Sequence, residues 1–560
     1  MSSWDRRQFL QASALGVAGT ALGCAGLPRA VEEARRPNVL IIITDDQGYG
    51  DLACHGNPHV RTPNLDRLHD ESVRLSNFYV CPVCSPTRSS LMTGRYNYRT
   101  GVVDTFQGRS MMHPDEVTLA EVLRGTGYRT GIFGKWHLGD NYPLRAMDQG
   151  FEESLVLKGG GLAQPSDFPP GGTYFDPILL HNGQAEQRPG YCTDIFAAAA
   201  IEFIKQHQHE PFFTYLATNA PHTPLQVDDK YVASYRDMGL EEDTAKTYGM
   251  IANLDENVGR VLQALDDLGL RENTLVWFLT DNGGWWKPEA PRYSAGMRGT
   301  KTTVYEGGIH VPSFIRWPRF GANADIPTVA AHIDILPTVL EICGAPLPQD
   351  RKIDGRSLVP LLTGAAGAWP ERTLFFQWHR GDVPEAFKNC AARDARYKLV
   401  DGKELYDLLK DPGETTDISS ENPEMVARLR QEYEAWFADV SAERQFAPPR
   451  IPLGTVLENP VLLTSQDWRG EQRSQTEKSA YWEVFVATDG QYEITLDFAD
   501  KPAAGKATLN VGGVEVEQEF IAPLNHWRFG GLSLSKGDTR LEFLVQGETS
   551  GVRYVHVRKL

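Results

Sequence analysis

Four runs of apolar residues along the chain have the length and composition of buried β-strands. They span 38–44, 129–133, 212–216 and 274–280, and each leads directly into polar residues. An apolar run without alternation indicates a strand that is covered on both faces, as in a parallel sheet. Because ligands of such sheets bind beyond the carboxyl ends of the strands, the polar residues that follow these runs are candidates for a functional site.

Stretches with helical spacing of apolar residues alternate with these strands. We predict helices at about 64–75, 118–124, 194–207 and 244–268. Strands that alternate with helices predict an α/β fold, in which a doubly wound, mixed and largely parallel sheet is flanked by helices. We assign this domain to 37–370.

The pattern changes beyond this domain. Short strands at 397–400 and 404–408, followed by a helix at about 423–440, predict a small antiparallel sheet with one helix. We assign this subdomain to 371–442.

The last part of the chain has the pattern of an all-β domain. A proline-bearing stretch within 443–461 is typical of a linker. Beyond it, strand-like residues are broken by turn signals at Asp489-Gly490 and Gly512-Gly513. This pattern predicts an appended β-sandwich, an accessory domain at 462–560.

The first residues have the pattern of an export signal. Arg6-Arg7 precedes an apolar, Gly- and Ala-rich stretch at 12–27, so segment 1–30 resembles a twin-arginine (Tat) signal. We therefore expect the Tat machinery as a partner and a periplasmic or secreted enzyme. The stretch is too short and too rich in Gly to favour a membrane span, so we expect no transmembrane span in the mature chain. A lipid anchor at Cys24 is an alternative.

Charge and cysteine content exclude several classes of protein. The 560-residue chain has a formal net charge of −17 and no long run of Lys or Arg, which argues against a nucleic-acid partner. In such a chain an anion can bind only in a local pocket of Arg, Lys or metal. Seven cysteines are too few for disulfide bonds to be the main support of a fold of 560 residues, and their pairing cannot be read from the sequence.

Two strand ends carry ligands that suit a hard metal ion. Asp45 and Asp46 follow the first strand, and Asp281 and Asn282 follow the strand at 274–280. Carboxylate and amide oxygens suit calcium, and magnesium is the alternative, whereas zinc favours His or Cys. The sequence therefore predicts one divalent cation here.

One cysteine stands in a distinctive motif. Ser85 is a good N-cap and Pro86 suits the first helical position, so we expect Cys84 just before a helix. The pattern Cys-x-Pro-x-Arg, followed by Thr-Gly-Arg at 93–95, resembles the signature of the type I, formylglycine-dependent sulfatases of the alkaline phosphatase superfamily. In that family the cysteine is oxidised to formylglycine (3-oxoalanine) by a maturation enzyme, which we expect as a partner.

Other segments match that family in the expected order. They are 44–48, 134–139, 220–224, 280–284 and 299–301, and the resemblance covers about 37–417. It implies the following sites: catalytic Cys84, Arg88, Lys135, His137, His222, Asp281 and Lys301; metal-binding Asp45, Asp46, Cys84, Asp281 and Asn282. His310 stands where many relatives carry Arg, and we assign it no role.

The resemblance also implies a mechanism. A hydroxyl of the aldehyde hydrate, activated by Asp281, attacks sulfur while the metal and nearby cations neutralise the sulfate oxygens. His222 and Lys301 hold and protonate the leaving oxygen. His137 then deprotonates the second hydroxyl, and sulfate leaves as the aldehyde reforms.

We therefore predict a sulfuric ester hydrolase that is arylsulfatase-like and acts in sulfated polysaccharide degradation. Export, the β-sandwich and Trp285-Trp286 favour a sulfated carbohydrate over a small aryl sulfate, with the Gly/Pro-rich loop at 159–176 as a rim of the pocket. One alternative is a phosphodiesterase or phosphonate monoester hydrolase of the same superfamily. Another is a non-catalytic glycan-binding protein.

Overall fold

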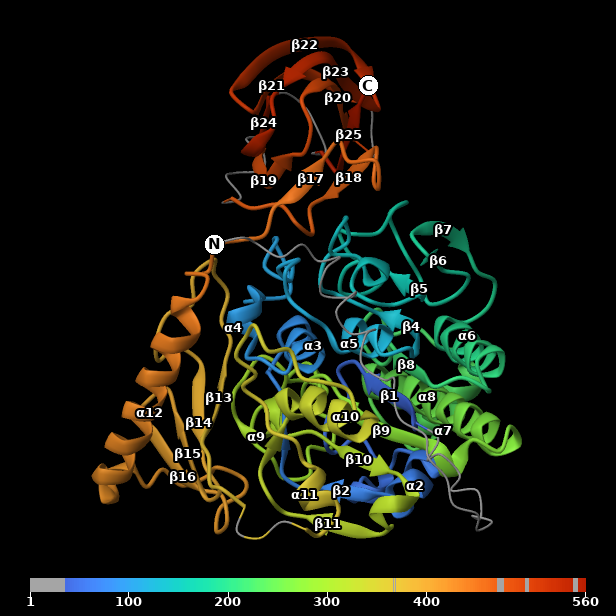
Figure 1. Ribbon diagram of the computed structural model, residues 1–560, viewed down its shortest axis with the longest axis vertical. Coiled ribbons are helices and arrows are strands. Elements are labelled where there is room, and N and C mark those ends of the chain that lie inside the picture. The colour runs from blue at the N-terminus through green and yellow to red at the C-terminus, as the bar shows by residue number, and fades with distance from the viewer. Residues whose placement is uncertain (1–35, 366, 368, 471–477, 499–502, 547–551) are drawn as a thin grey trace, which may run out of the picture.

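The computed structural model describes residues 36–365, 367, 369–470, 478–498, 503–546 and 552–560 (Figure 1). The expected signal segment and Cys24 lie outside this range. Within it, no helix is long and apolar enough to cross a membrane.

A ten-stranded mixed sheet forms the centre of the α/β domain, as predicted. Its five middle strands, in the order β9-β1-β8-β4-β5, run parallel, and antiparallel pairs lie on either side of them. The strands in order across the sheet are β11 (Ala324–Ile326), β2 (Val73–Leu75), β10 (Ser313–Arg316), β9 (Thr274–Thr280), β1 (Asn38–Thr44), β8 (Phe212–Ala217), β4 (Arg129–Lys135), β5 (Glu153–Leu157), β6 (Ile178–His181) and β7 (Gln184–Gln187). The four runs read from the sequence are therefore adjacent parallel strands.

Helices cover both faces of this sheet (Figure 1). The helices of this domain are α2 (Pro63–Asp70), α3 (Cys84–Thr93), α4 (Asn97–Thr100), α5 (Leu119–Gly125), α6 (Cys192–Gln206), α7 (Asp229–Asp237), α8 (Glu242–Asp267), α9 (Glu306–Ile309), α10 (Ile335–Cys343) and α11 (Val359–Leu362). A short parallel pair, β3 (Phe78–Tyr79) and β12 (Ala330–Ala331), completes the domain.

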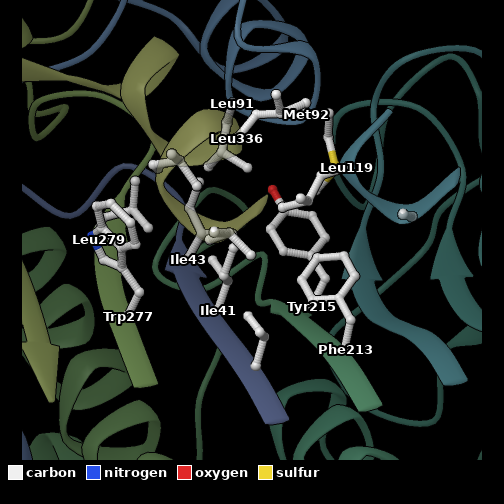
Figure 2. Close-up of a cluster of buried hydrophobic side chains, with 14 of the residues drawn as sticks. Ile41, Ile43, Leu91, Met92, Leu119, Phe213, Tyr215, Trp277, Leu279 and Leu336 are labelled. Atoms are coloured by element: carbon white, nitrogen blue, oxygen red, sulfur yellow. The ribbon is translucent and has the colours of Figure 1, made fainter. Parts of the chain in front are cut away.

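The two hydrophobic cores explain why β1 is apolar throughout. Successive side chains of a strand point to opposite faces of the sheet. Ile41 and Ile43 pack with Leu91 of α3 and Leu336 of α10, as Figure 2 shows, whereas Leu40 packs with the core under α6 and α8. A strand that is buried on both sides has no solvent-exposed face, so apolar and polar residues do not alternate along it.

The structure corrects one helix prediction. Residues 73–75, which we expected at the end of a helix, form β2 and pair with β10. The helix α2 ends at Asp70, and Val73 and Leu75 then alternate with Arg74 as strand residues do. A three-residue strand is too short for its period to be distinguished from that of a helix.

The structure also corrects the start of the helix that carries the cysteine motif. Val83, in an extended conformation, is the N-cap of α3 and makes no side-chain cap, so Cys84 is the first helical residue. The hydroxyl of Ser85 is buried and has no hydrogen-bond partner in the described part of the chain. The start of this helix is therefore buried, and no side chain in the described structure caps it.

An antiparallel sheet with one helix follows, as predicted. The sheet order is β13 (Leu374–Gln377), β14 (Cys390–Arg393), β15 (Tyr397–Val400) and β16 (Glu404–Asp407), and the helix is α12 (Pro423–Ala442). Its core includes Leu429 and Trp436 of α12.

The last part of the chain forms a β-sandwich with one shared core. One sheet is β17 (Ile451–Leu453), β19 (Lys478–Val486), β24 (Gly537–Gln546), β21 (Ala503–Val511) and β22 (Val514–Leu524). The other is β18 (Val461–Thr464), β25 (Tyr554–Lys559), β20 (Gly490–Asp497) and β23 (His526–Leu534).

Strand β17 corrects the expected linker at 443–461. Ile451 and Leu453 are buried in the sandwich core, and β17 pairs with β19. Pro452, which suggested a linker, is tolerated because β17 is an edge strand and need not donate on both sides.

Candidate active site

Polar residues at the ends of three strands converge on one edge of the central sheet. Asp45 and Asp46 follow β1, Asp281 and Asn282 follow β9, and β4 ends at Lys135. All five are at least 95% buried. Asp46 has a left-handed φ of 62°, so the chain turns sharply after β1. Ligand sites of parallel sheets occur at this edge.

Four side chains at this edge form a cluster that suits a metal ion. Ligand atoms of Asp45, Asp46, Asp281 and Cys84 all lie within 4.8 Å of one another. The Sγ of Cys84 is 3.6 Å from Oδ1 of Asp45. Three buried carboxyl groups so close together repel one another unless cations lie between or beside them.

The side-chain amide of Asn282 indicates that this cluster fits a cation. Its Nδ2 donates to Oδ1 of Asp46 at 2.9 Å and to the Gly283 carbonyl at 2.9 Å. Its Oδ1 is buried and has no hydrogen-bond partner among the described residues. A buried amide oxygen without a partner costs about 1–3 kcal/mol, and coordination of a cation would satisfy this one. Carboxylate and amide oxygens together fit a hard divalent cation.

Three cations surround the carboxylates. Arg88 donates to Oδ2 of Asp281 from its Nε at 3.1 Å and from a terminal nitrogen at 2.8 Å. Lys135 donates to Oδ2 of Asp45 at 2.6 Å. Lys301 donates to Oδ1 of Asp46 at 2.5 Å, and its Nζ is 3.4 Å from the Sγ of Cys84. The site therefore presents ammonium and guanidinium groups beside the cysteine.

The pKa of Asp46 is lowered, whereas the pKa values of Asp281 and Cys84 are raised. Burial alone raises the pKa of Asp46, but the Lys301 ammonium and His222 outweigh it and hold that pKa below its usual range. Burial and the Asp45 carboxylate raise the pKa of Asp281 to about 6. Burial raises the pKa of the Cys84 thiol to about 12. The unmodified thiol is therefore protonated at neutral pH and is a poor nucleophile.

Two histidines complete the site, each oriented by a backbone carbonyl. His137 Nε2 donates to the Thr105 carbonyl at 2.9 Å, and its Nδ1 is buried without a hydrogen-bond partner in the described residues. His222 Nδ1 donates to the Thr223 carbonyl at 2.7 Å, and its Nε2 lies 3.8 Å from Oδ2 of Asp46. Burial lowers the pKa of both rings, that of His222 to about 4. Both are neutral at neutral pH.

The structure thus brings together every residue that the sequence assigned to the site: Asp45, Asp46, Cys84, Arg88, Lys135, His137, His222, Asp281, Asn282 and Lys301. His310, to which no role was assigned, pairs instead with Glu306 and the Ser76 carbonyl.

Sequence reasoning missed Arg292. This buried residue donates to the Asp46 carbonyl at 3.1 Å and pairs with Asp51 at 3.0 Å, so it supports the turn that carries Asp46. Its loop carries no motif that could have indicated this.

The expected substrate loops lie beside the site. One pocket is lined by Asp46, Trp285 and Trp286, among others. Trp286 packs against the Arg292 guanidinium, whereas Trp285 is 40% exposed. Gly160 contacts His137 so closely that a Cβ there would lie 2.4 Å from its ring. The start of the loop at 159–176 therefore reaches the site.

Family comparison decides what this site belongs to. A model of the sulfatase family matches residues 37–345, and a model described as N-sulphoglucosamine sulphohydrolase, C-terminal, matches 299–438. The chain belongs to the sulfatase family. This sulfatase is therefore a sulfuric ester hydrolase, in a family that generally uses a metal ion and a formylglycine.

Individual relatives agree with the family match. Arylsulfatase A of Homo sapiens is 35% identical, over 77% of the sulfatase chain and 92% of that protein. N-acetylgalactosamine-6-sulfatase of Homo sapiens is 32% identical, over 65% and 70% respectively. A solved structure described as Ps i-CgsB in complex with k-i-k-neocarrahexaose has a TM-score of 0.66 at 28% identity, over 73% of this chain and 94% of that chain.

The unpartnered oxygen of Asn282 gives a first prediction. Asn282→Leu removes this oxygen at similar volume and should weaken calcium binding by about tenfold or more, as measured by titration calorimetry on chelator-treated enzyme. Asn282→Asp keeps the oxygen and is the control that should retain binding. Equal calcium affinity in the Leu variant and the natural enzyme would remove Asn282 from the metal site.

Proposed function

We propose that this sulfatase removes sulfate from sulfated carbohydrates, with Cys84 as the precursor of its nucleophile and one calcium ion in the site. The observation that supports this most directly is the buried cluster of Asp45, Asp46, Asp281 and Cys84 beside three cations. Asp45, Asp46, Asp281, Asn282 and position 84 would hold the ion. When bound, the ion supplies positive charge to sulfate oxygens, and a formylglycine at position 84 supplies an aldehyde whose hydrate is the nucleophile.

The cations of the chain bind and orient the substrate. Arg88 and Lys135 are fixed by Asp281 and Asp45, so they present their charge with little reorganisation. Lys301 reaches the Sγ position of residue 84 at 3.4 Å and can therefore contact a sulfate held there. Positive groups lower the barrier because the attacking group must approach an ester that is already anionic.

Proton transfer is divided among three groups. Asp281 lies within the cluster around position 84 and is our candidate for accepting the proton of the attacking hydroxyl. His137 has its Nδ1 lone pair available, because Nε2 donates to Thr105, and we assign it the deprotonation that releases sulfate. Lys301 is the donor to the leaving oxygen.

His222 has a more limited role than its resemblance implied. Its Nδ1 donates to the Thr223 carbonyl, so Nε2 of the neutral ring is an acceptor. His222 can protonate the leaving oxygen only when it is itself charged. In the neutral ring it orients the substrate beside Asp46.

A carbohydrate substrate is supported by the exposed Trp285 beside the pocket, because sugars stack on exposed indole rings. The similar N-acetylgalactosamine-6-sulfatase and the structure with a bound neocarrahexaose point the same way. We further propose polysaccharide degradation as the setting, export by the twin-arginine route to the periplasm or beyond, and maturation of Cys84 by a formylglycine-generating enzyme.

Modification of Cys84 can be tested directly. Peptide mass spectrometry of active enzyme should find formylglycine at position 84, and Cys84→Ser should lower turnover of an aryl sulfate by at least about a thousandfold while the thermal unfolding temperature stays unchanged. A fully active enzyme with an unmodified thiol would contradict the proposal.

A matched aryl phosphodiester measured in parallel distinguishes a sulfatase from a phosphodiesterase, since the latter would turn over the diester faster.

The two tryptophans give a prediction about the substrate class. Trp285→Ala should raise KM for a sulfated oligosaccharide about tenfold, which corresponds to one stacking contact, and change KM for a small aryl sulfate little. Trp286→Phe, which keeps the packing on Arg292, is the control and should leave both values near those of the natural enzyme. Equal KM values for the oligosaccharide in the Trp285→Ala variant and the natural enzyme would exclude this ring from substrate binding.

A further inference from the structure

The β-sandwich reaches the catalytic centre through one side chain. Gln466 follows β18, is 98% buried, and donates from Nε2 to the Thr105 carbonyl at 2.9 Å. The same nitrogen lies 3.4 Å from the Ser110 hydroxyl, and the Gln466 carbonyl accepts from the Gly108 amide at 2.9 Å. Gln466 is therefore bonded along the loop that carries Thr105.

Thr105 connects this side chain to the active site. Its carbonyl accepts from both Gln466 and His137, each at 2.9 Å, and a carbonyl oxygen has two lone pairs for such bonds. A carbonyl cannot donate, so the hydrogen of the neutral ring lies on Nε2 of His137. The lone pair then lies on Nδ1, which is buried and unpartnered in the described structure.

Further contacts hold this part of the sandwich against the same loop. Arg469 donates to the Gly108 carbonyl at 2.8 Å, and Asp382 binds both Arg469 and Arg109, at 3.0 and 2.9 Å. The Arg469 and Asp382 side chains are 8% and 47% exposed, so the ion pair between them is partly buried. The position of the Thr105 carbonyl thus depends on the sandwich.

We infer that Gln466 is a positioning residue for catalysis, which fixes the tautomer and orientation of His137 through the Thr105 carbonyl. The sandwich is then part of the catalytic unit. This inference rests on the proposed role of His137. Without the Gln466 donor, the Thr105 carbonyl loses one of two fixed partners and the ring loses its fixed orientation.

Gln466→Met tests this, because Met keeps the length and apolar packing of Gln and removes the donor. We expect kcat for an aryl sulfate to fall about tenfold with KM unchanged, the size typical of losing a residue that orients an active-site histidine. Tyr554→Phe is the control, because it removes another bond between the sandwich and the body, to the Asp167 carbonyl, without touching Thr105. Both variants should unfold at similar temperatures, but only Gln466→Met should lose kcat.

His137→Ala separates this inference from the proposed function. If His137→Ala retains full kcat, the proposed role of His137 fails. If His137→Ala is impaired and Gln466→Met is within about twofold of the natural enzyme, Gln466 does not position the histidine.

An independent observation concerns a second group of ligand-type side chains. The Sγ of Cys54 and one ring nitrogen each of His55 and His69 lie within 4.8 Å of one another. His55 Nδ1 donates to the Tyr49 carbonyl at 2.8 Å, and His69 Nδ1 lies 2.9 Å from a carboxylate oxygen of Asp70. Neither Nε2 has a hydrogen-bond partner among the described residues. Metal-binding histidines are oriented in this way, with one nitrogen held by an oxygen and the other available.

The surroundings keep this cluster in place. The His55 ring stacks on Tyr49 at 3.9 Å between centroids, and Phe314 meets the rings of His55 and His69 edge-on at 5.7 and 5.2 Å. One thiol and two imidazoles suit zinc or a similar transition metal rather than calcium. We propose that Cys54, His55 and His69 bind such an ion, with water as the fourth ligand, separately from the catalytic metal.

Zinc and cobalt are the probes for this site. Untagged enzyme saturated with calcium should bind one zinc ion per chain in equilibrium dialysis, and the cobalt complex should show thiolate-to-metal charge transfer. Cys54→Ser should abolish the charge-transfer band, and His69→Ala should lower zinc affinity at least about tenfold. Cys343→Ser, a buried thiol elsewhere, is the control and should change neither. If Cys54→Ser, His69→Ala and the natural enzyme bind zinc with equal affinity, the proposed zinc site is wrong.

Discussion

Three carboxylates are buried together at the carboxyl edge of the central sheet, and the rest of the active site depends on balancing their charge. Removing one partner from a buried ion pair costs about 3–5 kcal/mol, because the other charge is left uncompensated in a medium of low dielectric. Arg88, Lys135 and Lys301 each pair with a different carboxylate. The same pairs fix the positions of three cations, so the contacts that allow burial also preorganise the groups that we propose bind an anionic ester.

Backbone conformation places these pairs within reach. Asp46 and His137 both have left-handed φ values, 62° and 59°, just beyond the strands that carry them. Gly134 lies against β8 so closely that a Cβ would be 1.8 Å from the Ala217 carbonyl oxygen. Only glycine fits there, and it allows Lys135 to reach Asp45 at the same edge of the sheet. Such strained positions persist because the surrounding parallel strands hold them.

The sequence predicted the sheet well, because strands follow from local pattern, whereas most of the proposed site residues were assigned through the family resemblance. The run at 38–44 reads as a strand on its own, and the Asp pair after it is a visible ligand set. Arg292 and Gln466 could not be found in this way. Each acts through a contact distant in sequence, Arg292 with Asp51 and Gln466 with Thr105, and neither stands in a motif. Strand β17 was not predicted because it contains Pro452, and proline occurs in a strand mainly at the edge of a sheet, a position that the sequence does not reveal.

The charge balance also bears on the divalent ion that we propose for this site. Three carboxylates face three cations, so the protein groups by themselves give a pocket close to neutral. The chain as a whole carries a net charge of −17, which repels an anionic substrate at long range. A divalent ion held beside the Asn282 oxygen would make this nearly neutral pocket positive. In a buried site of low dielectric, that local charge would outweigh the distant negative charge, which water and salt screen over about 10 Å.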